Sequence, residues 1–140
     1  MKYKNHSVKY INNDLIQRLK QHARRSDVRT QHASAIVEHK TGRVMAIASN
    51  YHLHNCHSEH IIKKGDTYTI HAEKAVYNKF VRKYPHLAKR REREYDIVVV
   101  RIKRDADHFQ ISKPCVHCTK WINKLMEKNK INNVYYTVNS

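Results

Sequence analysis

Two short motifs in this chain carry residue types that bind metals and move protons. Residues 71–73 read His-Ala-Glu, and residues 114–118 read Pro-Cys-Val-His-Cys. One imidazole and two thiolates are a known ligand set for catalytic zinc, which keeps a fourth coordination position for water or substrate. We therefore expect His71, Cys115 and Cys118 to hold Zn²⁺.

The carboxylate of the first motif is the candidate proton carrier. In the middle of a helix, side chains two positions apart diverge by about 200°, so Glu73 would point away from His71. In the first turn they need not diverge, and we expect a helix to begin at this motif. Zinc lowers the pKa of a bound water from near 16 toward about 7, and Glu73 can accept the proton that this water releases.

The Cys-x-x-Cys spacing suits the start of another helix. In a first turn the sulfurs of Cys115 and Cys118 point the same way, Pro114 needs no N–H donor, and the positive helix terminus favours thiolates. The same spacing by itself is also typical of a structural zinc ribbon or a redox pair. A ribbon normally needs a second Cys-x-x-Cys, which this sequence lacks, and Cys56 offers no such partner.

The spacing of apolar residues predicts the elements that position these motifs. Asn13 is expected to cap a helix whose buried stripe contains Leu15, Ile16, Leu19 and Ala23. Residues 35–37 and 44–48 flank a Lys-Thr-Gly turn and predict a β-hairpin in which Gly42 supplies the positive φ. Residues 51–70 read as a long, polar, His-rich loop.

The second half of the chain predicts a helix from His71 to the Tyr84-Pro85 break, a central strand at 95–102, a helix at 115–128 and a strand at 134–138. The order is α-β-β-α-β-α-β. Two strand-helix-strand crossovers imply a parallel portion beside the hairpin. We predict an α/β fold, a three-layer α/β/α sandwich around a mixed sheet of four to five strands.

Composition agrees with a compact enzyme in one domain over residues 1–140. No segment is apolar enough to span a bilayer, and the start of the chain lacks a signal-peptide core. Three cysteines, two of them at metal-ligand spacing, favour a reducing compartment. We therefore expect an intracellular protein, cytoplasmic or nuclear, that is not secreted and has no membrane partner.

Charge is the second informative property, because 28 Lys and Arg against 12 Asp and Glu give a formal net charge of +16. Such a field attracts the phosphates of a nucleotide, a nucleic acid or an anionic membrane surface. A solvated basic surface without a polyanionic partner is the alternative.

Taken together, the two motifs, in this order and separated by an apolar strand, resemble the zinc deaminases of the cytidine and deoxycytidylate deaminase superfamily. The resemblance extends from about the first helix to the last strand. It implies an α/β/α sandwich in which His71, Cys115 and Cys118 hold zinc. It also implies that Glu73 shuttles protons and that the backbone of Ala72 contacts the pyrimidine carbonyl.

Asn50 adds to this resemblance, because the superfamily often keeps at this position an asparagine that touches sugar or base. Cys56 is similar to a cysteine that deoxycytidylate deaminases place several residues later. The Gly and Pro that usually follow the asparagine are absent here, and many relatives continue into a further helix and strand. We expect the contacts of that part to come from a neighbouring subunit of a homo-oligomer or from the 51–70 loop.

Three functions are consistent with these residues. The first is hydrolytic deamination of cytosine to uracil in a nucleotide or nucleoside such as deoxycytidylate. The second is deamination of cytosine or adenine within single-stranded DNA or RNA, for which the basic charge argues. The third, which the presence of Glu73 disfavours, is a non-catalytic, zinc-stabilised module that binds nucleic acid.

Weaker candidates lie elsewhere. Five residues of the 51–70 loop offer a second metal site or simply a solvated His-rich segment: His52, His54, Cys56, His57 and His60. Tyr135 and Tyr136 are candidates for stacking on a base, although alternation along a strand predicts that at least one is structural. Four basic residues are either a candidate phosphate-binding site or an exposed charged turn: Lys89, Arg90, Arg91 and Arg93. Trp121 is expected in the core.

Overall fold

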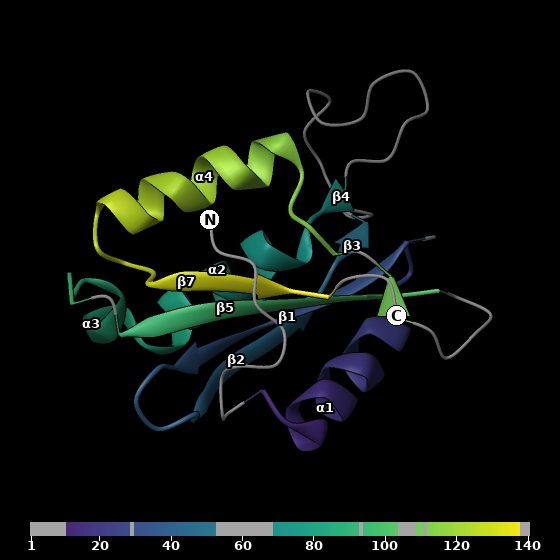
Figure 1. Ribbon diagram of the computed structural model, residues 1–140. Coiled ribbons are helices and arrows are strands. Elements are labelled where there is room, and N and C mark those ends of the chain that lie inside the picture. The colour runs from purple at the N-terminus through teal and green to yellow at the C-terminus, as the bar shows by residue number, and fades with distance from the viewer. Residues whose placement is uncertain are drawn as a thin grey trace.

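A computed structural model describes residues 11–28, 30–52, 69–92, 94–103, 109–110 and 112–137. In chain order the elements are α1 (Asn13–Arg24), β1 (Gln31–Glu38), β2 (Val44–Ser49), β3 (Tyr51–His52), β4 (Thr69–Ile70), α2 (Ala72–Lys83), α3 (Pro85–Ala88), β5 (Tyr95–Ile102), β6 (Phe109–Gln110), α4 (Val116–Glu127) and β7 (Asn133–Tyr136). Figure 1 shows their arrangement.

Among the residues that the structure describes, the main sheet has five strands, and β5 is its centre. β2 pairs with β1, β1 pairs with β5, and both β6 and β7 pair with β5. β1 runs antiparallel to β2 and β5, whereas β7 runs parallel to β5. The mixed sheet predicted from the two crossovers is therefore confirmed, as is the central place of the apolar run at 95–102.

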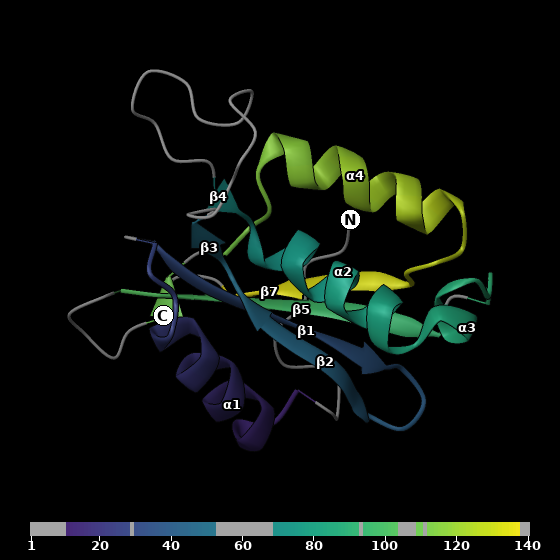
Figure 2. The same cartoon turned by 180° about the vertical axis from the view of Figure 1, so that it is seen from behind.

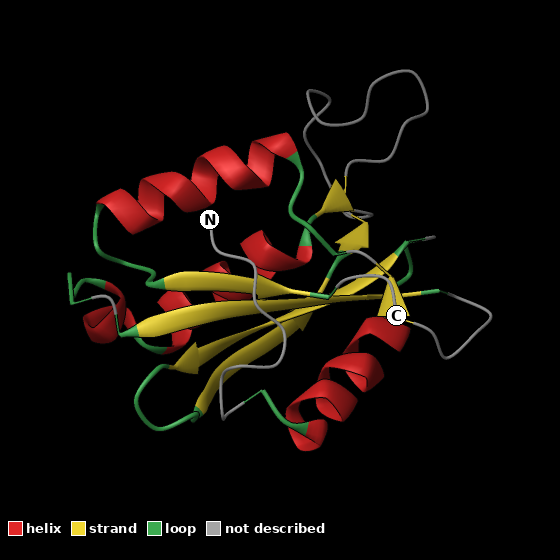
Figure 3. Ribbon diagram, in the orientation of Figure 1, coloured by secondary structure: helices red, strands yellow, loops and turns green. Residues whose placement is uncertain are grey.

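Helices cover both faces of this sheet, as the secondary-structure colouring in Figure 3 makes clear. Alternate residues of β1 point to opposite faces: Ile36 belongs to the core beneath α2 and α4, and Ala35 belongs to the core beneath α1. Figure 2, from behind, shows α2 and α4 together on the first face. The three-layer α/β/α architecture that the resemblance implies is thus confirmed.

The helix starts differ slightly from expectation. Asn12, not Asn13, caps α1, because the Asn12 Oδ1 accepts a 3.0 Å hydrogen bond from the Leu15 N–H. Its buried stripe is Leu15, Leu19 and Ala23, while Ile16 is partly buried. At α4 the N-cap is Cys115, so Pro114 lies before the helix and not in its first turn.

The 51–70 stretch is not loop throughout. Tyr51 pairs with Ile70, and His52 pairs with Thr69, in a separate two-stranded antiparallel sheet. This pairing joins residues far apart in the sequence, so local spacing gave no sign of it. Residues 53–68, including His54, Cys56, His57 and His60, lie outside the described residues, and so does Arg93.

A buried carboxylate, Asp96, connects neighbouring segments at the end of the sheet opposite the starts of α2 and α4. Asp96 is fully buried at the start of β5, and its oxygens lie 2.8 Å from the His39 Nδ1 and 3.0 Å from the Asn133 N–H. The Asn132 side chain donates a further bond of 3.2 Å. Asp96 therefore ties the β1–β2 turn to the start of β7.

Other expectations have mixed outcomes. The α1, β1, β2 and β5 predictions hold, and Gly42 has the positive φ of 75° expected in the hairpin turn. Trp121 is only half-buried and packs against the core from its edge. Within the described ranges, no helix has both the length and the apolar character needed to cross a membrane.

Candidate active site

The ligand candidates meet where two helices begin. His71 is the N-cap of α2 and Cys115 is the N-cap of α4, and both have extended backbones. The His71 Nδ1 lies 3.2 Å from the Cys118 Sγ and 3.5 Å from the Cys115 Sγ. The structure thus brings together three residues that are 44 and 47 positions apart along the chain.

The spacing of these atoms fits one metal ion. All three candidate ligand atoms lie within 4.8 Å of one another. In a tetrahedral zinc site with bonds near 2.1 and 2.3 Å, a nitrogen and a sulfur ligand lie about 3.6 Å apart. The observed distances are close to this value, and both cysteines are free thiols. The His/Cys/Cys group can therefore hold a metal.

Glu73 lies beside this group and is almost completely buried, with 4% of its surface exposed. Burial raises the pKa of its carboxyl group above the usual range. As expected for a helix that begins at this motif, Glu73 does not diverge from His71, because His71 caps the helix with an extended backbone and Glu73 stands in the first turn. Both side chains consequently face the same space.

The thiol of Cys118 is also buried. Burial raises its pKa, and the nearby negative charge of Glu73 raises it further. A thiolate in this position needs a neighbouring positive charge, because desolvation penalises the anion. A metal cation supplies that charge when it binds, and binding then releases the thiol proton. This is the donor chemistry expected of a buried metal ligand.

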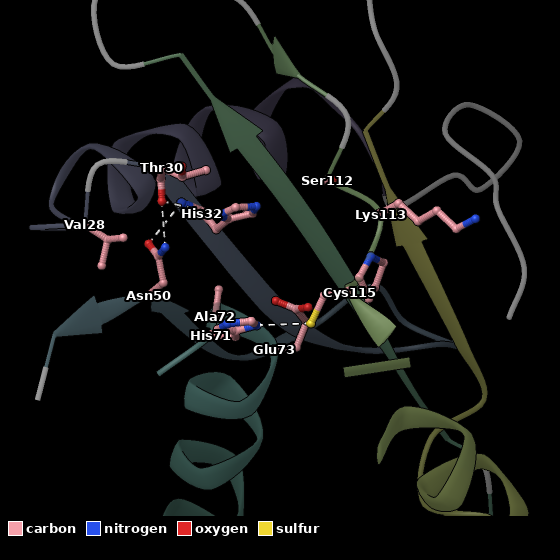
Figure 4. A pocket seen from close by; sticks show the side chains of 11 residues that line it. Val28, Thr30, His32, Asn50, His71, Ala72, Glu73, Ser112, Lys113 and Cys115 are labelled. Atoms are coloured by element: carbon pink, nitrogen blue, oxygen red, sulfur yellow. Dashed lines mark hydrogen bonds between the residues drawn. The ribbon is translucent and has the colours of Figure 1, made fainter. Parts of the chain in front are cut away.

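A cavity of about 250 Å³ opens over the group. Its lining includes Val28, Thr30, His32, Asn50, His71, Ala72, Glu73, Ser112, Lys113, Pro114 and Cys115. Figure 4 shows Glu73, His71 and Cys115 together on one side, with Thr30, His32 and Asn50 across from them. Lys113 belongs to the lining, but its side chain points away from the ligand group.

Ser112 fixes the segment that leads to Cys115. Its hydroxyl donates to the Val99 carbonyl oxygen at 2.7 Å and accepts from the Thr137 N–H at 2.7 Å. The backbone of Ser112 also donates to the Thr137 carbonyl oxygen at 3.0 Å. The cysteine motif is therefore anchored to the central strand and to the end of β7.

Asn50 lines the cavity, but most of its hydrogen-bonding capacity is used within the protein. Its Oδ1 accepts from the Ser26 hydroxyl at 2.6 Å and from the His32 N–H at 3.0 Å. Its Nδ2 donates to the Thr30 carbonyl oxygen at 2.7 Å. The contact with substrate stays a prediction, and the remaining N–H of Asn50 is the group suited to make it.

Ala72 is fully buried at the first position of α2, and it lines the cavity. A backbone N–H at this position has no acceptor within its own helix. It is therefore suited to the predicted contact with a pyrimidine carbonyl, which stays a prediction.

Comparisons with known proteins give a similarity to a solved structure. No protein-family model and no curated protein matches the chain. Among solved structures, the chain is similar to that of a dCMP deaminase from the cyanophage S-TIM5 in complex with dCMP and dUMP. The two share 20% sequence identity, the match covers 89% of this chain and 82% of that chain, and the TM-score is 0.47.

Sequence reasoning missed some cavity residues and misjudged others. His32 was not singled out, although its alternation with Ser34 and Ile36 along β1 could have placed it on the α2 side of the sheet. Tyr135 is buried and packs with the α1 core, and Tyr136 is half-buried against the opposite core. Neither tyrosine is among the cavity residues named above.

Proposed function

We propose that this protein is a zinc-dependent hydrolytic deaminase that converts cytosine to uracil in a nucleotide or nucleoside such as deoxycytidylate. The observation that carries the proposal is the convergence of His71 Nδ1, Cys115 Sγ and Cys118 Sγ beside the buried carboxyl group of Glu73. The cavity over this group supports it, because a base can approach the carboxyl group there.

Each residue has a part in the proposed reaction. His71, Cys115 and Cys118 would hold the zinc ion, which when bound lowers the pKa of a coordinated water toward about 7 and so makes a nucleophile available at neutral pH. In the overall reaction a C–O bond forms at the amino-bearing ring carbon, the C–N bond breaks, and ammonia leaves.

Glu73 moves the protons of this reaction. It takes a proton from the attacking water, passes one to the ring nitrogen, and finally protonates the departing amino group. Burial supports this assignment, because a carboxyl group with a raised pKa holds a proton closer to neutral pH than an exposed one does.

Replacing Glu73 tests this assignment. In Glu73→Gln the side chain keeps its size and loses its proton-accepting oxygen, so turnover should fall by at least about a thousandfold while zinc stays bound. The matched control is Glu127→Gln, at the exposed far end of α4, which should keep wild-type turnover.

The measurement is mass spectrometry of the products from cytidine, deoxycytidine, their monophosphates, a single-stranded oligonucleotide and transfer RNA. Conversion of an amino to a keto base by the wild type, and none by Glu73→Gln, is expected. Equal turnover by both proteins would remove Glu73 from the mechanism. A zinc-loaded wild type that converts no substrate would favour the non-catalytic binding module.

A second candidate is deamination of a base within single-stranded nucleic acid, which the basic surface favours. Along α4 and its C-cap, four exposed residues are three or four positions apart and so share one face: His117, Lys120, Lys124 and Lys128. This face begins two residues after Cys115. A phosphate backbone lying along α4 would therefore pass close to the cavity.

A further inference from the structure

His32 lines the cavity but takes no part in the proposed chemistry. It is the second residue of β1, and its backbone N–H donates to the Asn50 Oδ1 at 3.0 Å. Its side chain shares a sheet face with Ile36, on the side that α2 and α4 cover. Figure 4 shows the ring reaching from the Thr30 side toward the space over Ala72.

A hydrogen bond fixes the tautomer of this ring. The His32 Nδ1 lies 3.4 Å from the Thr30 carbonyl oxygen. A carbonyl oxygen only accepts, so Nδ1 must carry the hydrogen, because the other tautomer would set a lone pair against the carbonyl oxygen. In the neutral ring, Nε2 then has a lone pair.

The ring is neutral at physiological pH. Burial, with a smaller contribution from the neighbouring Arg101 cation, lowers the pKa of His32 to about 4. Arg101 is the register partner of His32 on β5, so their side chains share one face of the sheet. In the described part of the chain, no hydrogen-bond donor is recorded for the Nε2 atom.

The chemistry of Nε2 limits what it can bind. A lone pair requires a donor, and a cytosine nucleotide has donors at the amino group of its base and at the hydroxyls of its sugar. The amino group must meet Glu73, across the cavity from His32. Phosphate oxygens are acceptors and would be repelled. The sugar hydroxyls are the donors that remain.

We propose that His32 Nε2 accepts a hydrogen bond from a 2′- or 3′-hydroxyl of the substrate sugar, which makes His32 a specificity-determining residue. This inference rests on the proposed deaminase function. Asn50 cannot replace His32 as the acceptor, because its Oδ1 already accepts two hydrogen bonds within the protein.

The test measures kcat/KM of the wild type and of His32 variants on substrates that differ only in their sugar hydroxyls. The substrates are the 5′-monophosphates of cytidine, 2′-deoxycytidine, 3′-deoxycytidine and 2′,3′-dideoxycytidine. The variant is His32→Phe, which keeps a flat ring without the acceptor, and the matched control is His86→Phe on the exposed surface of α3. His32→Gln restores an acceptor oxygen and serves as the conservative variant.

For the wild type, loss of the hydroxyl that His32 binds should lower kcat/KM by about tenfold, the usual effect of one substrate hydrogen bond. His32→Phe should lose about the same factor on the hydroxylated substrate and nothing further on the dideoxy substrate. His32→Gln should recover part of the discrimination, and His86→Phe should match the wild type. The 2′- and 3′-deoxy substrates identify the hydroxyl.

Two results would overturn the inference. If His32→Phe kept the wild-type ratio of kcat/KM between hydroxylated and deoxy substrates, another group would be the one that binds the hydroxyl. An equal loss on all four substrates, with a lowered Tm, would assign His32 a purely structural part. If the wild type deaminates none of the four, the proposed function itself fails for free nucleotides, and the inference falls with it.

Discussion

At the residue scale, the site contains ionisable groups whose charged forms are disfavoured by burial. Cys118 is a buried thiol beside a carboxyl group, and Glu73 is a carboxyl group with almost no exposure. Each is costly by itself, because burial penalises its charged form. A cation held by His71, Cys115 and Cys118 would offset this cost, which is a physical reason to expect a metal at this place.

His32 gives a pH prediction at the same scale. Its pKa is 6.5 in the unfolded chain and about 4 in the folded protein. As the pH falls from 6.5 toward 4, the unfolded chain takes up a proton that the folded protein does not, so stability decreases over this window. Above pH 6.5 the residue contributes no pH dependence.

Thermal unfolding between about pH 4 and 8 measures this effect. His32→Phe has no group to titrate, so its Tm should fall less steeply with acid than that of the wild type. Comparison with His86→Phe removes the general effect of losing an imidazole. Parallel curves for the wild type and His32→Phe would contradict the assigned pKa.

At the element scale, the segment before α4 decides where the cysteines lie. Ser112 joins it to β5 and to the residue after β7 through its hydroxyl. These hydrogen bonds hold the chain three residues before Cys115, so their loss should loosen the position of the cysteine ligands. Loss of hydrogen bonds that orient metal ligands typically lowers metal affinity by about tenfold or more.

Ser112→Ala should therefore weaken zinc binding by about tenfold and lower the free energy of unfolding by about 1–3 kcal/mol, because the Thr137 N–H loses a buried acceptor. Thr41→Ala, in the exposed hairpin turn, is the matched control. It should leave zinc affinity unchanged and lower the free energy of unfolding by less than Ser112→Ala does, because its hydrogen bonds are exposed to solvent. Competition with a zinc chelator measures the first quantity and urea unfolding the second. Unchanged zinc affinity in Ser112→Ala would show that Cys115 and Cys118 are positioned without the hydrogen bonds of Ser112.

The sequence predicted the long elements and not the short ones. α1 and β5 have strong apolar patterns, and burial of these patterns dictates where they lie. β3, β4 and β6 have two residues each and form through pairing with distant segments. No local pattern encodes such pairing.

The candidate site was predictable to a similar degree. The two motifs, together with their resemblance to the zinc deaminases, pointed to His71, Glu73, Cys115 and Cys118, and the structure brings the three candidate ligands together. The tautomer of His32 was not predictable, because it depends on a carbonyl oxygen that the fold places beside the ring. The internal hydrogen bonds of Asn50 come likewise from three different segments.

At the scale of the whole molecule, the formal charge of +16 should make activity on the two candidate substrates depend differently on salt. A free nucleotide carries few phosphates, whereas a strand along α4 would neutralise several lysines and release its counterions. Homo-oligomerisation stays a prediction from the resemblance, and the single domain over residues 1–140 stays a prediction from length and composition.

Raising the salt concentration distinguishes these substrates. If nucleotides are the substrate, kcat/KM for deoxycytidylate should fall by less than about threefold between 50 and 200 mM NaCl. Activity on an oligonucleotide should fall by about tenfold or more if that is the substrate, and Lys120→Gln with Lys124→Gln should reduce this dependence. A steep salt dependence on the oligonucleotide with no turnover of deoxycytidylate would replace the first proposal with the second.

The zinc centre of one imidazole and two sulfurs can be tested by metal analysis of the purified protein. We expect about one zinc per chain in the wild type and in Cys56→Ser, and about a tenth of that or less in Cys115→Ser and Cys118→Ser, since a site with two protein ligands binds zinc far more weakly. A wild type without zinc, or a Cys118→Ser variant that keeps a full equivalent, would contradict the account.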